Sequence, residues 1–223
     1  MQREGEDAEM KTVLFDLDGT ISDSKEGITK CAQYALRHFG IEEPDPDKLE
    51  FFIGPPLRYT FQKYYGMDEK TAEAATEKYR ERYHTTGIYE CRMYEGVPEL
   101  LRSLKEQGYQ IGLASSKPEE SCRIILEHFG IAEYFDEVVG ATMDGRIDSK
   151  KEVLQEALRR LEIADVSQAV LVGDTHFDVE GAAEVGMSCI GITYGFGTRE
   201  ELEKSGAAEV LDSPLELKKY FEK

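Results

Sequence analysis

The sequence has little of the cysteine, tryptophan and continuous hydrophobic stretch that mark several classes of protein. It contains four cysteines in 223 residues, seven prolines and no tryptophan. The cysteines lie far apart with no C-x-x-C pair, which excludes the usual metal-ligand spacing and would make a disulfide framework sparse. No hydrophobic run approaches the roughly eighteen residues of a membrane span. We therefore expect reduced thiols and a cytoplasmic, globular protein that does not bind membranes.

Basic residues are also scarce. The chain has 27 Lys and Arg against 45 Asp and Glu, a formal net charge of −18. This balance argues against a nucleic acid or an anionic membrane surface as partner, because both need clustered positive charge. An anionic substrate would need positive charge supplied locally. The first nine residues, MQREGEDAE, are acidic, unlike a signal peptide. We expect a tail before the first strand, and Met10 is an alternative start.

Strand-like and helix-like segments alternate along most of the chain. Five short, nearly continuous apolar runs are typical of strands buried on both faces of a parallel sheet, at 11–17, 110–115, 137–141, 169–173 and 188–193. Helical spacing occurs at 97–107, 118–129, 150–161 and 176–185. The chain is long enough to bury a substantial core. The alternation predicts an α/β fold with a Rossmann-like, doubly wound parallel sheet.

The segment from residue 22 to residue 95 breaks this alternation. It contains no convincing strand, and helical patterns are found at 25–39, 46–53, 56–65 and 68–84. An α-helical insert directly after the first strand suits a cap domain over the carboxyl edge of the sheet, where α/β sheets bind ligands. We therefore predict a core formed by residues 1–21 and 96–223, and a helical cap formed by residues 22–95.

Two aspartates follow the first predicted strand, in Asp16-Leu17-Asp18-Gly19-Thr20. Residues i and i+2 of a strand point to the same side, so the two carboxylates converge on the crevice above the sheet. Burying such a pair is costly unless a cation or a proton lies between them. A solvated acidic turn is the alternative, and the apolar strand that leads directly into the pair argues against it.

A second acidic pair, Asp174 and Asp178, follows the strand predicted at 169–173. Asp174 belongs at the same edge of the sheet, and Asp178 lies one helical turn further along. A set of oxygen ligands favours a hard ion such as Mg²⁺. Helix capping would explain one aspartate here, but it gives no purpose to the pair after the first strand.

Hydroxyl and ammonium groups follow the other two strands. Ser115, Ser116 and Lys117 precede a helix that begins at Pro118, where backbone N–H groups can bind an anion. Lys150 opens the next helix, a position that the helix macrodipole disfavours for a cation. We therefore expect an anionic group beside Lys150. Each of these signals is weak alone, since such segments are usually solvated surface.

Together the four motifs resemble those of the haloacid dehalogenase superfamily, which consists mostly of phosphatases. Their order is Asp-x-Asp-Gly-Thr, then Ser or Thr, then Lys, then Gly-Asp-x-x-x-Asp, each at a predicted strand end. The resemblance covers nearly everything after Met10. Many relatives have Asn where this chain has Ser116, a departure that concerns substrate contacts more than the chemistry.

The resemblance implies catalytic roles for four residues. Asp16 would be the nucleophile that takes the phosphoryl group as an aspartyl phosphate. Asp18 would protonate the leaving group and then activate the hydrolytic water. Ser115 and Lys150 would hold the phosphoryl oxygens, and Lys150 would also offset the charge of Asp16.

The resemblance also implies the metal and substrate contacts. Asp16, the backbone carbonyl of Asp18 and Asp174 would bind Mg²⁺, while Asp178 would support these ligands from behind. One lysine and Mg²⁺ would make a locally positive site in an acidic protein. The remaining candidates for substrate contacts are Gly19, Thr20, Ser116, Lys117 and Arg58. A solvated helix arginine is an equally good interpretation of Arg58.

The motifs favour phosphomonoester hydrolysis over other reactions of the superfamily. A haloalkanoate enzyme has no need of an acid at Asp18, and a phosphonate-cleaving member lacks it. Sugar-phosphate mutases typically have Glu-Asp where this chain has Gly173-Asp174. The segment from Phe52 to Arg58 resembles phosphoglycolate phosphatase-like members with a C1 cap, among which are 5′-nucleotidases and pyrophosphatases. The expected partner is a small phosphorylated metabolite.

Two other classes of function stay open. A phospho-accepting signalling domain also uses an aspartate, Mg²⁺, a hydroxyl and a lysine, but its acidic pair precedes the phosphorylated residue and no cap interrupts it. In this chain Asp18 follows Asp16, which favours turnover over storage. A catalytically silent binding protein is the third possibility, and the intact motifs argue against it. We expect a monomer or a weak homodimer.

Overall fold

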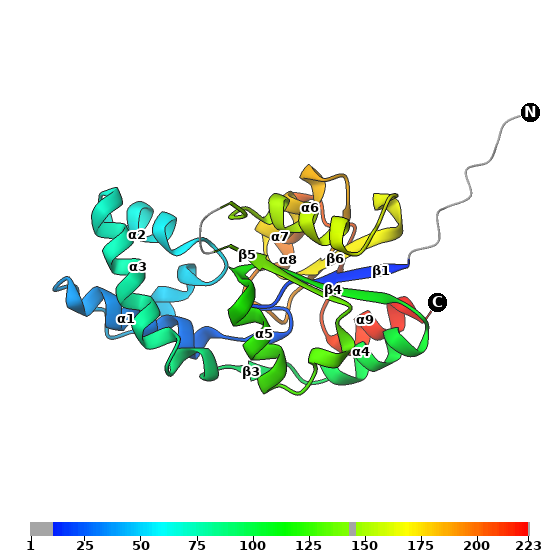
Figure 1. The fold of residues 1–223 in the computed structure, drawn as a ribbon, viewed down its shortest axis with the longest axis horizontal. Helices are drawn as coiled ribbons and strands as arrows, with labels where there is room; N and C mark the ends of the chain where they lie inside the picture. Colours follow the sequence, from blue (N-terminus) through cyan, green and yellow to red (C-terminus); the bar gives the residue numbers. More distant parts are fainter. Residues whose placement is uncertain (1–10, 143–145, 223) are drawn as a thin grey trace, which may run out of the picture.

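The core of the molecule is a six-stranded sheet with the strand order β5-β4-β1-β6-β7-β8 (Figure 1). The computed structural model describes residues 11–142 and 146–222, so the tail expected at the N-terminus lies outside the described residues. All neighbouring strands are parallel. The strands are β1 (Thr12–Phe15), β4 (Gln110–Pro118), β5 (Glu137–Ala141), β6 (Ala169–Gly173), β7 (Ser188–Ile192) and β8 (Glu209–Leu211). The predicted α/β class is confirmed.

Helices cover both faces of this sheet, and β1 shows how the residues are divided between them. Val13 and Phe15 pack on one side, in the same hydrophobic cluster as α4, α5 and α9. Leu14 packs on the other side with α6, α7 and α8. Because both faces are buried, the strand has a continuous apolar sequence. The helices are α4 (Val97–Glu106), α5 (Glu119–His128), α6 (Lys150–Arg160), α7 (His176–Glu184), α8 (Arg199–Ser205) and α9 (Pro214–Phe221).

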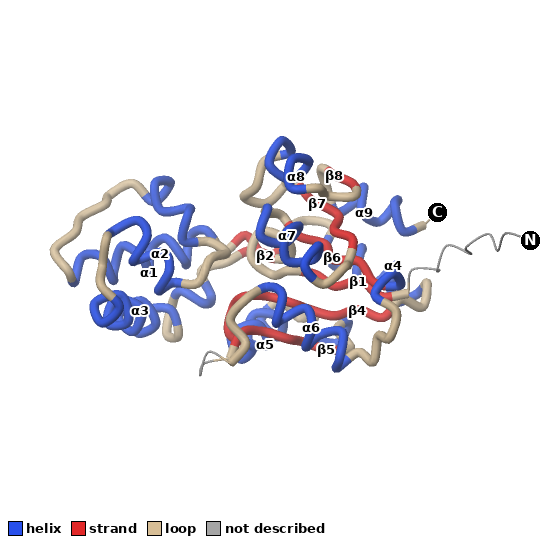
Figure 2. The backbone as a smooth tube through the Cα atoms, turned by 90° about the horizontal axis from the view of Figure 1, so that it is seen from above, coloured by secondary structure: helices blue, strands red, loops and turns tan. Residues whose placement is uncertain are grey.

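A group of helices lies beside one end of the sheet, on the opposite side from α4 and α9 (Figure 2). It comprises α1 (Lys25–His38), the 3₁₀ helix η1 (Pro46–Phe52), α2 (Leu57–Tyr65), α3 (Glu69–Tyr83) and the 3₁₀ helix η2 (Gly87–Tyr89). Two short strands, β2 (Ser22–Asp23) and β3 (Arg92–Met93), pair antiparallel at its two ends. The chain therefore leaves and re-enters the core at one place, which supports the proposed cap at residues 22–95.

The strand β1 lies at the point where the order in which strands are added to the sheet reverses. The chain adds β4 and β5 on one side of β1, and β6, β7 and β8 on the other. In sheets of this kind, ligands bind in the crevice outside the carboxyl ends of the strands at this point. The predicted motif residues follow or end the strands that meet there.

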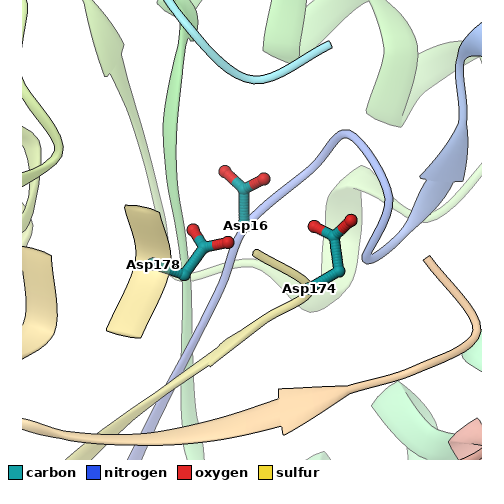
Figure 3. Close-up of side chains that lie close together, drawn as sticks. All are labelled: Asp16, Asp174 and Asp178. Atoms are coloured by element: carbon teal, nitrogen blue, oxygen red, sulfur yellow. The ribbon is translucent and has the colours of Figure 1, made fainter. Parts of the chain in front are cut away.

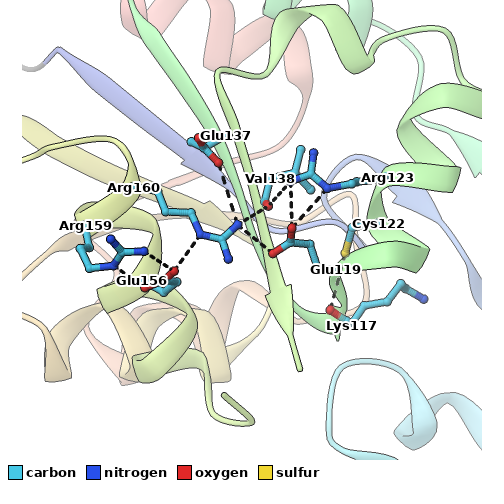
Figure 4. Close-up of polar contacts among 9 residues, drawn as sticks. All are labelled: Lys117, Glu119, Cys122, Arg123, Glu137, Val138, Glu156, Arg159 and Arg160. Atoms are coloured by element: carbon cyan, nitrogen blue, oxygen red, sulfur yellow. Dashed lines mark hydrogen bonds and ion pairs between the residues drawn. The ribbon is translucent and has the colours of Figure 1, made fainter. Parts of the chain in front are cut away.

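A network of ion pairs joins α5, α6 and the edge strand β5 (Figure 4). Glu119, the first residue of α5, accepts from Arg123 at 2.8 Å and from Arg160 at 2.9 Å. Arg123 also donates to the carbonyl oxygen of Val138 at 3.1 Å. These contacts tie the two helices to the edge strand β5, which pairs with β4.

The hydrophobicity of the helices and the state of the cysteines bear on two of the expectations above. Across residues 11–142 and 146–222, no helix combines the length and the hydrophobicity that a membrane span needs. All four cysteines are free thiols, of which Cys31, Cys122 and Cys189 are buried.

Candidate active site

Three aspartates converge at the carboxyl edge of the sheet (Figure 3). Asp16 follows β1, and its backbone N–H donates to the carbonyl oxygen of Val172 on β6 at 2.9 Å. Asp174 follows β6, and Asp178 lies in the first turn of α7. One carboxylate oxygen of each lies within 4.8 Å of the others. The topology therefore brings residues separated by about 160 positions into one buried cluster.

Lys150 neutralises part of this charge. Its Nζ lies 2.7 Å from Oδ1 of Asp16 and 2.7 Å from Oδ1 of Asp178, and it donates to the carbonyl oxygen of Ala114 at 3.1 Å. Burial alone would lower the pKa of Lys150, but the two carboxylates outweigh burial and hold the pKa well above its usual value. The ammonium group is therefore charged. The anionic group expected beside this lysine is the aspartate pair.

The remaining negative charge fits a bound cation. Burial raises the pKa of Asp16 to about 6, although Lys150 opposes the rise, and burial holds the pKa of Asp174 well above its usual range. Three carboxylates against one ammonium leave excess negative charge in a site of oxygen donors. Such a donor set suits a hard divalent ion such as Mg²⁺.

Asp178 is already occupied on both carboxylate oxygens. Oδ1 pairs with Lys150, and Oδ2 accepts from the backbone N–H and the hydroxyl of Thr175 at 3.0 and 3.1 Å. Asp178 therefore closes the start of α7 and holds Lys150 in place. This position suits the supporting role expected for it, which stays a prediction.

Close backbone packing fixes Asp174. Its Oδ2 accepts from the backbone N–H of Phe196 at 2.8 Å, and its Oδ1 accepts from the Thr20 hydroxyl at 3.4 Å. A Cβ at Gly19, which has φ of +86°, would collide with the Asp174 carboxylate, and so would a Cβ at Gly195. Glycine is needed at both positions because the backbone touches the carboxylate. Gly19 and Thr20 thus hold Asp174 in this structure, and their expected contact with substrate stays a prediction.

The other predicted residues of the core line a small cavity of about 20 Å³ over this cluster. Ser115 and Ser116 lie along it, beside Asp18 and Lys117. Ser115 is 2% exposed. The Lys117 ammonium lies 3.0 Å from Oδ2 of Asp18. A volume of this size holds about one water molecule.

Arg58 lies elsewhere, along a larger cavity of about 430 Å³ between the helical insert and the core. Asp18, Ser116 and Lys117 line both cavities, so the two spaces meet at these residues. Arg58 is half exposed, and its Nε lies 3.0 Å from Oε2 of Glu73. The structure therefore places Arg58 away from the acidic cluster.

Some residues of the site were not found from the sequence. The Phe196 backbone fixes Asp174, and the Tyr83 hydroxyl accepts from Lys117 at 2.7 Å. Tyr79 and Tyr83 both line the larger cavity and are four residues apart on α3. In the sequence, the helical spacing of Tyr79 and Tyr83 could have indicated that they share one face of a helix. The glycines on either side of Phe196, at 195 and 197, could have indicated a close backbone approach there.

Comparisons with known proteins extend over both parts of the chain. A family model described as haloacid dehalogenase-like hydrolase matches residues 13–192. A protein named 5′-nucleotidase from Pseudomonas aeruginosa is 43% identical over 190 residues, which is 85% of this chain and 86% of that protein. A protein named tyrosine-protein kinase PtkA from Mycobacterium tuberculosis is 36% identical over 198 residues, 89% of this chain and 67% of that protein.

Two further similarities point to phosphatases. A protein named phosphoglycolate phosphatase from Aquifex aeolicus is 31% identical over 189 residues, 84% of this chain and 86% of that protein. A crystal structure described as that of "a predicted phosphatase from Clostridium acetobutylicum" has a TM-score of 0.93 at 42% identity, covering 96% of this chain and 99% of that one. The likeness includes the sheet and the helical insert.

Proposed function

The chain belongs to the haloacid dehalogenase-like hydrolases and is a phosphatase of that family, and we propose that it hydrolyses phosphate monoesters of small metabolites with Mg²⁺. The observation that carries this proposal is the buried cluster of Asp16, Asp174 and Asp178 with Lys150 paired to Asp16 at 2.7 Å. A carboxylate that can act as nucleophile, a fixed ammonium group and two further carboxylates suit phosphoryl transfer, which depends on positioning and on neutralising negative charge.

The proposed reaction has two steps, both centred on Asp16. In the first, an Asp16 carboxylate oxygen forms a bond to phosphorus while the bond from phosphorus to the leaving-group oxygen breaks. Asp18 gives its proton to that oxygen. In the second, Asp18 takes a proton from water, the water oxygen bonds to phosphorus, and the bond from phosphorus to Asp16 breaks. The products are an alcohol, inorganic phosphate and the starting enzyme.

The other core residues bind and orient the phosphoryl group. The Ser115 hydroxyl and the Lys150 ammonium are proposed to hold its oxygens. Asp16, Asp174 and the backbone carbonyl of Asp18 are proposed to hold Mg²⁺, which when bound would neutralise negative charge on those oxygens. The excess of buried carboxylates supports this ligand set.

The substrate remains a proposal between two candidates. The segment Phe52–Arg58 supports a phosphoglycolate phosphatase-like specificity, with Arg58 as the contact to a second anionic group. The cavity of about 430 Å³ favours a larger leaving group, because a two-carbon acid would fill little of it. The ring of Tyr59, which is 45% exposed, lines this cavity, and an exposed ring can stack on a base. We therefore propose 5′-nucleotides as the second candidate.

The proposed partner is a small phosphorylated metabolite, with no nucleic acid and no membrane surface. The formal net charge of −18 supports this, because it opposes binding to extended polyanions. We propose a cytoplasmic monomer or weak homodimer. Gel filtration coupled to light scattering at two concentrations tests the oligomeric state.

Phosphate release from a panel of substrates tests the proposed function. The purified chain with Mg²⁺ is assayed on 2-phosphoglycolate, nucleoside 5′-monophosphates, pyrophosphate and para-nitrophenyl phosphate. Steady turnover supports the proposal, and the highest kcat/KM identifies the substrate class. Release of a single slow equivalent would indicate a phospho-accepting protein, and no release from any compound would indicate a silent binding protein.

A further inference from the structure

Lys117 lies where the two cavities meet, in a distorted part of β4. The pairing of β4 with β5 shifts register between Ser115 and Pro118. A bulge of this kind re-aims the side chains that it contains. The Lys117 side chain is 8% exposed and lines both the small cavity and the larger one. A buried lysine in this position requires charged or polar partners.

Its partners come from both sides of the gap between core and cap. Lys117 Nζ lies 3.0 Å from Oδ2 of Asp18, and it donates to the hydroxyl oxygen of Tyr83 at 2.7 Å. Tyr83 ends α3 in the helical insert. Lys117 therefore joins the expected acid–base residue to the cap through two short contacts.

The two carboxylate oxygens of Asp18 differ in their contacts. Its Oδ2 takes the Lys117 contact, while its Oδ1 is buried and has no hydrogen-bond partner among the described residues. An unpaired buried carboxylate oxygen is costly unless another group uses it. In the proposed reaction that group is the leaving-group oxygen in the first step and water in the second.

We propose that Lys117 and Tyr83 are positioning residues that orient Asp18 for its proton transfers, and that Tyr83 makes this orientation depend on the cap lying over the core. Lys117 anchors Oδ2, so that Oδ1 points to the reacting atoms. Tyr83 steadies the ammonium group from the opposite side. The inference rests on the proposed function, since it assigns a device to the same site.

The charge states of the two groups agree with this geometry. Burial alone would lower the pKa of Lys117, but Asp18 and the neighbouring tyrosines outweigh burial and hold the pKa well above its usual value. Burial raises the pKa of Tyr83 to about 12, so its hydroxyl is neutral. A charged donor bound to two oxygen acceptors is a strong and directional arrangement.

The test compares two leaving groups in the variant Lys117→Met. Para-nitrophenyl phosphate has an activated leaving group that departs without a proton, whereas glycerol 3-phosphate needs the proton from Asp18. We expect kcat/KM for the aryl phosphate to stay within about twofold, and kcat/KM for glycerol 3-phosphate to fall about tenfold or more. We expect kcat to fall for both, because water attack on the phosphoenzyme also uses Asp18. Stopped flow should show a burst of nitrophenol near one equivalent.

A milder variant and two controls make the test independent of folding. Tyr83→Phe keeps the packed ring and removes only the hydroxyl, and we expect the same pattern at smaller size, about threefold. In the double variant, Tyr83→Phe should lower kcat/KM for glycerol 3-phosphate little further than Lys117→Met alone, because Tyr83 acts through Lys117. Tyr34→Phe removes a cap hydroxyl that contacts Glu81 at 3.3 Å on the surface, and Lys105→Met removes a surface pair with Asp136. Both controls should match the wild type.

The outcomes separate this inference from the proposed function. A wild-type protein inactive on every phosphate ester would overturn the proposed function. A wild-type protein that turns over, together with Lys117→Met and Tyr83→Phe variants that lose kcat/KM equally on both substrates, would show that the pair serves folding or phosphate binding. Unchanged kinetics in both variants would also overturn the inference.

Discussion

The end of the site proposed to bind phosphate (the phosphate end) and the end proposed to bind the leaving group (the leaving-group end) are built in opposite ways. At the phosphate end, side chains follow strand ends, are almost fully buried and surround a cavity of about 20 Å³. At the leaving-group end, residues on the helices of the insert line about 430 Å³, and Arg58 there is half exposed. The first end is fixed by backbone contacts, and the second by side chains that can change without disturbing the sheet. The chemistry and the choice of substrate can therefore vary independently.

The Asp174 surroundings show what fixes the phosphate end. Gly19 and Gly195 each leave no room for a side chain, and the Phe196 N–H binds the carboxylate. Any larger residue at either glycine would displace the Asp174 carboxylate. In the larger cavity, by contrast, the ion pair of Arg58 among the described residues is with Glu73, which is itself on the insert. A change of partner there costs little.

The largest effect is expected from Asp16→Asn, which should break the phosphate end for every substrate. An amide does not attack phosphorus, so we expect turnover to fall by at least about a thousandfold on both an alkyl and an aryl phosphate. Circular dichroism should show an unchanged fold. Near-normal turnover on either compound would contradict the assignment of Asp16 as nucleophile.

Removal of the metal should also abolish turnover, and the stabilisation of the fold by the metal should depend on pH. The folded-state pKa of Asp16 is raised from 3.8 to about 6. The folded protein therefore holds this proton to higher pH than the unfolded chain, so the contribution of Asp16 to stability falls as pH rises from 3.8 to about 6. A bound cation reverses this loss because it favours the charged carboxylates.

We accordingly expect Mg²⁺ to raise Tm more near pH 8 than near pH 5, and chelator to abolish activity until Mg²⁺ is restored. Differential scanning fluorimetry with and without Mg²⁺ at the two pH values measures the first effect. Ca²⁺ should inhibit, because its looser coordination permits bidentate binding of Asp16. Full activity in excess chelator would remove Asp174 from the proposed ligands.

A smaller and selective effect is expected at the leaving-group end. Arg58→Ala should raise KM for the preferred anionic substrate about tenfold, which corresponds to about 1.4 kcal/mol of binding, and change KM for a small aryl phosphate little. The opposite control is Glu73→Gln, which frees Arg58 and should lower KM for the same substrate. Equal losses on both substrates would assign Arg58 to the fold, and no loss would return it to solvated surface.

The smallest effect is expected from the ion-pair network beside β4. Arg160→Met removes contacts to Glu119 and Glu156 at 2.9 and 2.8 Å. Partly exposed pairs contribute little individually, so we expect a loss of about 1 kcal/mol in the free energy of unfolding. The ratio of kcat/KM between alkyl and aryl phosphates should not change. A changed ratio would show that this network, rather than backbone packing alone, aligns the strand end.

The sequence was most informative where burial is complete. The run KTVLFDL predicted β1, because a parallel strand buried on both faces is nearly continuous in apolar residues up to the edge of the sheet. The strands β2, β3 and β8 were missed, since two or three residues show no period. The helices α8 and α9 were also not predicted.

Contacts across the two parts of the molecule could not be read from the sequence. Lys117 was expected to contact substrate, and the structure pairs it with Asp18 and Tyr83. The bulge between Ser115 and Pro118 sets this direction, and it depends on pairing with β5 rather than on the local sequence. Similarly, the Thr20 hydroxyl reaches the Asp174 carboxylate because β1 and β6 are neighbours in the sheet, and the sequence alone does not give this strand order.

The antiparallel pairing of β2 with β3 also affects how the chain folds. β1 pairs with β4 across 98 residues, most of which belong to the helical insert. When Ser22 meets Met93 first, the insert becomes a closed side loop and the remaining loop between β1 and β4 is about fourfold shorter. The entropy cost of joining these two neighbouring strands then falls by about 1 kcal/mol, while the cost of closing the side loop falls on the pairing of β2 with β3 and on the packing of the cap helices. The two-residue pairing thus separates the length of the insertion from the cost of pairing β1 with β4.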